Sequence, residues 1–173
     1  GPDQLGISRE QNNESRGHEF IYGSGKVTGR LLGGCLDSLY EMLVGGRYDD
    51  QPKIFNKYHV FPKKDEWRNK IIFLETSEEH PDPEKYRKML KSLENRGVFE
   101  EVAGMIVGKP QDEMYYKEYK EALLDIANKH DLPTVYNVNF GHTTPRIILP
   151  YGGLAEIDFT KKTLVLKEGL CLT

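Results

Sequence analysis

From Lys26 onward the sequence alternates short apolar runs with amphipathic segments, and this alternation limits the chain to an α/β or α+β organisation. The first apolar run, residues 26–34, reads KVTGRLLGG and predicts a strand that leads into a glycine turn. In residues 35–43, Leu36, Leu39, Tyr40 and Leu43 recur at the spacing of one helical face, which predicts a short helix.

The same alternation continues to the end of the chain and predicts an α/β domain by pattern. Gly97 and Pro133 stand where helices stop, and residues 160–162 read as a hairpin turn. The order of the strands is not predicted. The expected strands are 70–75, 103–109, 134–140, 146–150, 154–159 and 163–168, and the expected helices run from Glu84 to Arg96 and from Tyr115 to His130.

Length and charge narrow the class of protein. A chain of 173 residues is long enough for one domain with a sizeable core. A net charge of -3 with no basic stripe argues against a nucleic-acid partner. Cys35 and Cys171 lie far apart and show no metal-ligand spacing, so we expect neither a disulfide framework nor a zinc site, and no cofactor. No apolar run is long enough to span a membrane, and a reducing cytoplasm fits this composition best.

The first 24 residues differ from the rest. They are polar, have no sustained hydrophobic period, and cannot bury enough apolar area to offset the entropy lost on ordering. We expect residues 1–24 to form a linker or arm and residues 25–173 to form the domain. The opening Gly1-Pro2 is typical of what a protease leaves when a purification tag is removed.

Two titratable residues stand at the ends of apolar strands: Glu75 follows IIFL, and His142 follows VNFG. Strand ends line the working crevice of open α/β sheets. A hydroxyl nucleophile needs a base, and that base needs a carboxylate to orient its ring and stabilise its cation. Glu75 and His142 fit the carboxylate and the base. The same residues also fit a solvated or helix-capping carboxylate and a packed histidine, and the pattern alone does not decide.

Four segments, taken in order, resemble a known family. GKVTGRLLGGCLDSL, IIFLETSEE, GMIVGKP and NVNFGHTTPRIILPYGGLAEID look like the C-terminal domain of the serine peptidase family of L,D-carboxypeptidases and microcin C immunity proteins. The resemblance covers residues 25–168. It implies a three-layer swivelling β/β/α domain with a mixed sheet, and a protein that tends to form homodimers.

The resemblance also implies a Ser-Glu-His triad divided between two domains. Glu75 matches the family's glutamate after the apolar strand, and His142 matches the histidine of its Gly-His motif. The nucleophilic serine is expected in an N-terminal domain of the same protein, because no serine here lies in a Gly-x-Ser-x-Gly elbow. The serines of the chain are Ser8, Ser15, Ser24, Ser38, Ser77 and Ser92.

Within the family, the FGHTTP segment followed by LPYG is closer to the microcin immunity type, whose members hydrolyse the amide between an amino acid and a nucleotide-like group. The murein type, which removes a terminal D-alanine from a tetrapeptide, is the alternative. A non-catalytic α/β binding or oligomerisation module is a third possibility.

Several further residues have two interpretations. Many family members read Gly-Gly-Asn where this chain has Gly33-Gly34-Cys35, so Cys35 is a weak candidate for substrate binding and a stronger one for packing. The acids Glu75, Glu78 and Glu79 fit either a divalent cation or, more commonly, the N-terminal dipole of the next helix. The remaining histidines are expected on the solvated surface: His18, His59, His80 and His130.

Overall fold

The computed structural model describes residues 17–44, 61–139 and 149–167. Within these ranges seven strands form one sheet in the order β2-β6-β5-β4-β3-β7-β8. The strands are β2 (Glu19–Tyr22), β3 (Lys26–Cys35), β4 (Ile71–Glu75), β5 (Gly104–Gly108), β6 (Thr134–Val138), β7 (Leu149–Asp158) and β8 (Thr163–Leu166). The helices are α2 (Leu36–Val44), α4 (Pro83–Asn95), α5 (Val98–Glu101) and α6 (Tyr116–His130), with 3-10 turns η4 (Lys64–Trp67) and η5 (Gln111–Glu113).

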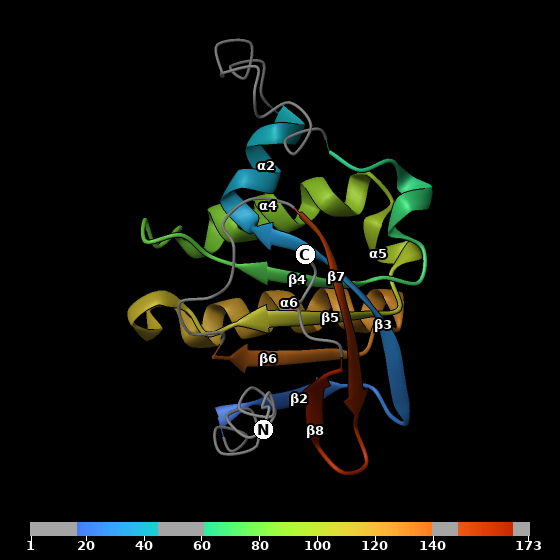
Figure 1. The fold of residues 1–173 in the computed structure, drawn as a ribbon. Coiled ribbons are helices and arrows are strands. Elements are labelled where there is room, and N and C mark those ends of the chain that lie inside the picture. Colours follow the sequence, from blue (N-terminus) through green and yellow to red (C-terminus); the bar gives the residue numbers. More distant parts are fainter. Residues whose placement is uncertain (1–16, 45–60, 140–148, 168–173) are drawn as a thin grey trace.

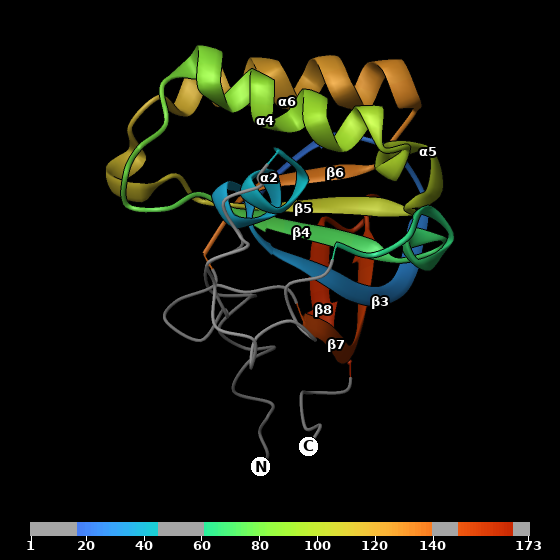
Figure 2. The ribbon, with the colours of Figure 1, turned by 90° about the horizontal axis from the view of Figure 1, so that it is seen from above.

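The domain has three layers, and its sheet is mixed. Strands β3, β4, β5 and β6 run parallel, while β2 pairs antiparallel with β6, β7 with β3, and β8 with β7. Helices α4 and α6 cover one face, and β7 and β8 lie across the opposite face (Figures 1 and 2). The predicted α/β class and the three-layer β/β/α arrangement are therefore confirmed.

Both faces of the central strands are buried, which explains why β4 is almost entirely apolar. Because successive side chains of a strand point to opposite faces, Ile72 and Leu74 pack under the helices, whereas Ile71 and Phe73 pack against the β7–β8 side. All four are at most 1% exposed. The apolar run that identifies β4 in the sequence therefore serves two separate cores and carries Glu75 at its end.

Strand β7 is longer than expected. The sequence predicts separate strands at 146–150 and 154–159, of which residues 146–148 lie outside the described residues. The structure has one continuous strand, Leu149–Asp158, that follows β3 along most of its length. The pairing shifts register between Arg30 and Leu32, and this irregularity accommodates the segment that reads as a turn in the sequence.

One strand lies inside the segment predicted as a linker or arm. Residues Glu19–Tyr22 pair with β6 at the edge of the sheet, Phe20 packs edge-on against Phe159 at 5.6 Å, and Ile21 packs against the helical side. His18, expected on the surface, is only 7% exposed. Four residues are too few to show a hydrophobic period, so tertiary pairing makes this strand. Residues 1–16 are outside the described part of the chain.

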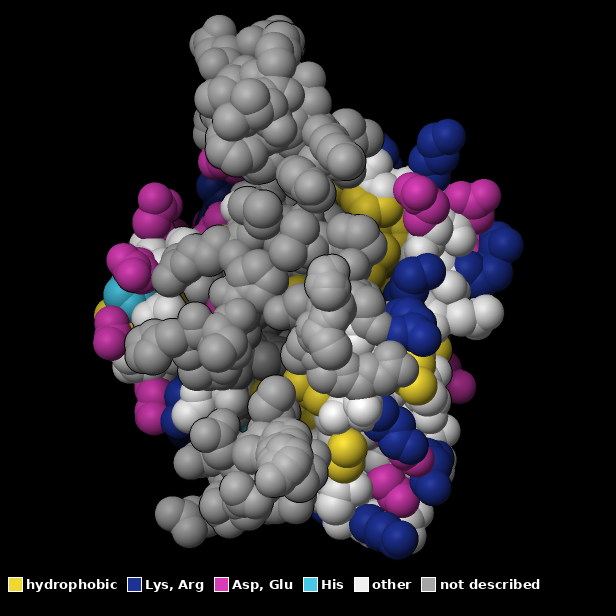
Figure 3. All heavy atoms as spheres, in the orientation of Figure 1, with side chains coloured by type: hydrophobic (Ala, Val, Ile, Leu, Met, Phe, Trp, Pro, Cys, Tyr) yellow, Lys and Arg dark blue, Asp and Glu magenta, His cyan; other side chains and the backbone are white. Residues whose placement is uncertain are grey.

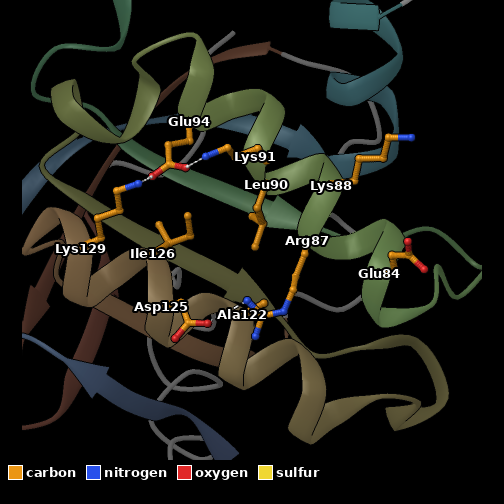
Figure 4. A pocket seen from close by; sticks show the side chains of 10 residues that line it. All are labelled: Glu84, Arg87, Lys88, Leu90, Lys91, Glu94, Ala122, Asp125, Ile126 and Lys129. Carbon is orange, nitrogen blue, oxygen red and sulfur yellow. Dashed lines mark hydrogen bonds and ion pairs between the residues drawn. The ribbon is translucent and has the colours of Figure 1, made fainter.

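Glu94 of α4 joins α4 to α6. Its carboxylate lies 2.7 Å from Nε2 of His130. It also lies 3.1 Å from Nζ of Lys129 and 3.3 Å from Nζ of Lys91 (Figure 4). The ring of His130 also packs against Phe99 at 5.9 Å, so the prediction that His130 is a solvated surface residue is wrong. Burial raises the pKa of the Glu94 carboxyl, but the hydrogen bonds from these three partners outweigh burial and lower the pKa from its ordinary 4.5 to about 2.

This cluster predicts an acid-sensitive contribution to stability. A carboxyl group with a depressed pKa in the folded state stabilises the fold above its unfolded pKa, and that contribution disappears as the pH falls through the folded value. For Glu94 the window runs from about 4.5 down to about 2. We expect Glu94→Gln to lower the free energy of unfolding near pH 7 by roughly 2 to 3 kcal/mol.

Urea unfolding of both proteins at a series of pH values measures the difference. It should narrow steadily below about pH 4.5, as the wild-type carboxylate takes up its proton. An equal difference at every pH would show that the carboxylate's charge is not what stabilises the contact. Lys88→Gln on the exposed side of α4 is a control for changing one charge on that helix.

Candidate active site

The carboxyl ends of four parallel strands meet at one edge of the sheet, where the arrowheads of β4, β5 and β6 point to the same side in Figure 1. Such an edge is where open α/β sheets bind ligands. Strand β7 begins at this edge too, because Leu149 pairs with Gly33 near the end of β3. The end of β6 and the start of β7 therefore both lie at the carboxyl edge of the sheet.

Glu75 is the last residue of β4 and lies at this edge. Its Cα is in register with that of Cys35, the last residue of β3. Four buried residues precede Glu75, whereas its own side chain is half-buried. The buried strand therefore ends in a carboxylate at the carboxyl edge of the sheet. Of the predicted site residues, the structure brings Glu75 and Cys35 side by side.

His142 lies outside the described residues. The residues on either side of the segment that contains it are Asn139, directly after β6, and Leu149, the first residue of β7. Both belong to the carboxyl edge. The pairing of His142 with Glu75 therefore stays a prediction from the sequence.

Cys35 is 7% exposed and its thiol points at a carboxylate. The Sγ–H donates to Oδ2 of Asp37 at 3.9 Å. Burial raises the pKa of the Cys35 thiol, and the nearby Asp37 charge acts in the same direction, so the sulfur is a neutral, weakly polar group at neutral pH. Contact of Cys35 with substrate stays a prediction, and its burial agrees with a packing role.

Asp37, which in the sequence reads only as part of a short helix, connects α2 to the loop after β4 at this edge. It lies in the first turn of α2, directly beyond β3, and its Oδ2 accepts a hydrogen bond from the backbone N–H of Ser77 at 3.1 Å. Ser77 is the second residue after Glu75. An aspartate in a first helical turn usually interacts with the helix dipole, so the sequence carried no sign of this longer contact.

Acidic side chains gather over the loops that follow β4 and β5, around one histidine at the left edge of Figure 3. Nε2 of His80 lies 2.9 Å from Oδ2 of Asp112 and ties the two loops together. The carboxylate that caps α4 is Asp82, which accepts the N–H of Lys85 at 2.8 Å; the dipole role expected for Glu78 and Glu79 falls to this residue. Within the described ranges, no group of three or more potential ligands is placed to hold a metal ion.

Two described serines, Ser77 near this edge and Ser92 in α4, have local structural roles. Oγ of Ser77 accepts a hydrogen bond from the Glu79 N–H at 3.1 Å, and the hydroxyl of Ser92 donates to the Met89 carbonyl at 2.6 Å. Neither stands on a strand-to-helix elbow of the kind that exposes a nucleophile.

A surface groove lies elsewhere, between α4 and α6 (Figure 4). Most of the residues that line it are charged, and Arg87 and Asp125 are paired across it at 2.8 Å. None of the predicted site residues lines it.

In the described part of the chain, no helix is long and apolar enough to cross a membrane.

Known proteins resemble this chain in sequence and in fold. A crystal structure of an MccF-like protein from Streptococcus pneumoniae in complex with AMP is 44% identical, with a TM-score of 0.72 over 87% of this chain and 44% of that one. The microcin self-immunity protein MccF of Escherichia coli is 28% identical over 86% of this chain and 39% of its own length. Its structure with aspartyl sulfamoyl adenosine gives a TM-score of 0.62.

A Bacillus subtilis protein named "Probable murein peptide carboxypeptidase" is 26% identical over 84% of this chain and 42% of its own length. The chain thus spans about two fifths of the length of these curated relatives. Residues 28–157 match the family described as LD-carboxypeptidase C-terminal domain. That match covers most of the sheet and both large helices, and the chain belongs to this family.

Proposed function

We propose that this chain is the C-terminal domain of a microcin immunity-type serine carboxypeptidase, in which Glu75 and His142 are two members of a Ser-Glu-His triad. The observation that carries the proposal is the position of Glu75, a carboxylate at the end of a buried strand on the sheet edge where α/β enzymes bind ligands. The nucleophilic serine belongs to an N-terminal domain of the same protein.

Chain geometry supports a meeting of Glu75 and His142. One strand, β5, separates β4 from β6, so the two strands are about 10 Å apart. His142 follows Asn139 by three residues, and three extended residues span at most about 10 Å. A histidine three residues beyond Asn139 can therefore reach the end of β4 without any change in the sheet.

The proposed chemistry is amide hydrolysis. His142 takes the proton of the serine hydroxyl as the oxygen attacks the scissile carbonyl, and returns it to the leaving amine. The Glu75 carboxylate orients the imidazole and stabilises the imidazolium that forms. The oxyanion donors are backbone N–H groups near the serine, in the N-terminal domain.

The ligands of the solved relatives favour a nucleotide-like substrate. The Streptococcus pneumoniae protein was solved with AMP, and MccF with aspartyl sulfamoyl adenosine and glutamyl sulfamoyl guanosine. We infer that the substrate joins an amino acid to a nucleotide-like group. The murein tetrapeptide is the second candidate, favoured by the similarity to the Bacillus subtilis protein.

The test is a hydrolysis assay of the full-length protein by mass spectrometry, with aspartyl sulfamoyl adenosine and a murein tetrapeptide offered separately. Cleavage of the first substrate, lost in His142→Ala, is the expected result. Cleavage of the tetrapeptide alone would move the protein to the murein type. Failure to cleave either substrate, from a folded sample, would overturn the proposal in favour of a binding module.

The chain of 173 residues should not turn over either substrate by itself, because it contributes neither the nucleophile nor the oxyanion donors. The same assay on the purified chain, run to long incubation times, measures this. Hydrolysis by the pure chain that His142→Ala abolishes would place the nucleophile within these residues and refute the division of the triad.

A further inference from the structure

We propose that Asp37 is a positioning residue for the site: its carboxylate holds the backbone directly after Glu75 and so fixes where the Glu75 carboxylate lies. This inference rests on the proposed catalytic role of Glu75.

The contact that carries the inference joins two elements far apart in sequence. Asp37 is on α2, and its Oδ2 accepts the backbone N–H of Ser77 at 3.1 Å. Only one residue, Thr76, separates Glu75 from Ser77. The hydrogen bond to the Ser77 N–H therefore holds the backbone where it leaves β4. The first turn of α2 and the exit of β4 are thus bound to each other at the candidate site.

The Asp37 carboxylate accepts a second hydrogen bond, from Cys35. The Cys35 thiol donates to the same Oδ2 at 3.9 Å, and Cys35 is in register with Glu75 across the β3–β4 pair. The Asp37 carboxylate thus accepts one hydrogen bond from the end of β3 and one from the loop after β4. Because β3 and β4 are also paired, these bonds tie the ends of both strands to the start of α2.

A purely structural role for Asp37 is the competing explanation. The first turn of a helix favours an acidic residue, and stabilising α2 needs no contact with another loop. The two roles differ in a measurable way. A helix-stabilising residue changes the free energy of unfolding, whereas a positioning residue also changes kcat in the folded enzyme.

The experiment compares Asp37→Ala and Asp37→Asn in the full-length protein, with aspartyl sulfamoyl adenosine as substrate. Asparagine keeps an acceptor for the Ser77 N–H but has no charge, and alanine has neither. We expect Asp37→Ala to lower kcat by about 10- to 100-fold with little change in KM, because small displacements of catalytic groups cost this much. Asp37→Asn should recover most of the rate. Equal losses in both variants would show an effect of charge and overturn the inference.

Asp82→Ala is the matched control, since it also removes an aspartate that accepts one backbone N–H, at the other end of the same loop. It should lose helix stability without losing kcat. An equal loss of kcat in Asp82→Ala and Asp37→Ala would reduce the effect to general loosening of the loop and overturn the inference. If Asp37→Ala does not fold, Asp37→Ser, whose hydroxyl is too short to reach Ser77, takes its place with the same expectation.

Glu75→Gln, measured beside these variants, separates the two proposals. A large loss in Glu75→Gln with wild-type kcat in Asp37→Ala overturns the positioning role and leaves the proposed function intact. A wild-type protein without hydrolysis, or a fully active Glu75→Gln, overturns both.

Discussion

Glu75→Gln in the full-length protein is expected to lower kcat by about 10³- to 10⁴-fold, which is the cost typical of replacing the triad carboxylate by its amide. The carboxylate accepts the imidazole N–H and stabilises the imidazolium, whereas a glutamine amide presents a donor as well as an acceptor and permits the wrong tautomer of His142. Because glutamine matches glutamate in shape, the half-buried end of β4 should fold as before.

Steady-state kinetics on aspartyl sulfamoyl adenosine measure this loss, with urea unfolding to verify that the fold is retained. Glu84→Gln makes the same chemical change in the first turn of α4, on an exposed position, and should leave kcat unchanged. A loss below about tenfold in Glu75→Gln would be too small for a triad carboxylate and would return Glu75 to the role of a solvated strand end.

Gly33→Ala is expected to destabilise the domain by about 3 kcal/mol or more, at the upper end of what overpacking costs. A Cβ on Gly33 would lie 2.0 Å from the carbonyl oxygen of Phe73 and 2.9 Å from its backbone N. These atoms belong to β4, and neither can move without breaking the β3–β4 pairing. A typical domain has only about 5 to 15 kcal/mol of stability, so this single methyl group removes a large share of it.

Urea unfolding of the chain measures the effect, and Gly17→Ala is the control, because a Cβ there meets nothing within 4 Å. The control should change the free energy of unfolding by less than about 1 kcal/mol. Equal small changes in both variants would mean that β3 can move away from β4, and that the close approach of the two strands is not required for folding.

The buried strands and the two large helices could be predicted because their patterns are long and their causes are local. The apolar run of β4 is explained by burial on both faces, and α4 combines an apolar stripe with a cap at Asp82 and a stop at Gly97. Gly97 adopts a left-handed conformation with φ of +80°, as its position after the helix predicts. The placement of Glu75 at a strand end followed from the same pattern.

The remaining features depend on contacts between residues far apart, which no local pattern shows. Strand β2 exists because β6 offers it a free edge, and His130 is half-buried because it contacts Glu94 and Phe99, which lie on other helices. The bond from Asp37 to Ser77 joins residues on different elements in the same way. The fold decides which of these residues become buried or paired. In the sequence, an aspartate or histidine that makes such a contact therefore cannot be told from one on the solvated surface.

The interior position of β3, between β4 and β7, has a consequence for how the protein is made. Its two neighbours are β4 and β7, and Lys26, the first residue of β3, pairs with Asp158, the last residue of β7. One side of β3 therefore stays without its partner until the residues as far as Asp158 have emerged from the ribosome. Pairings of such long separation form slowly and expose strand edges to aggregation while they wait. Strand β3, which carries Cys35 and leads to Asp37, is thus the last of the parallel strands to gain both of its neighbours. Removing the β7–β8 hairpin should lower the solubility of the domain before it disrupts any helix.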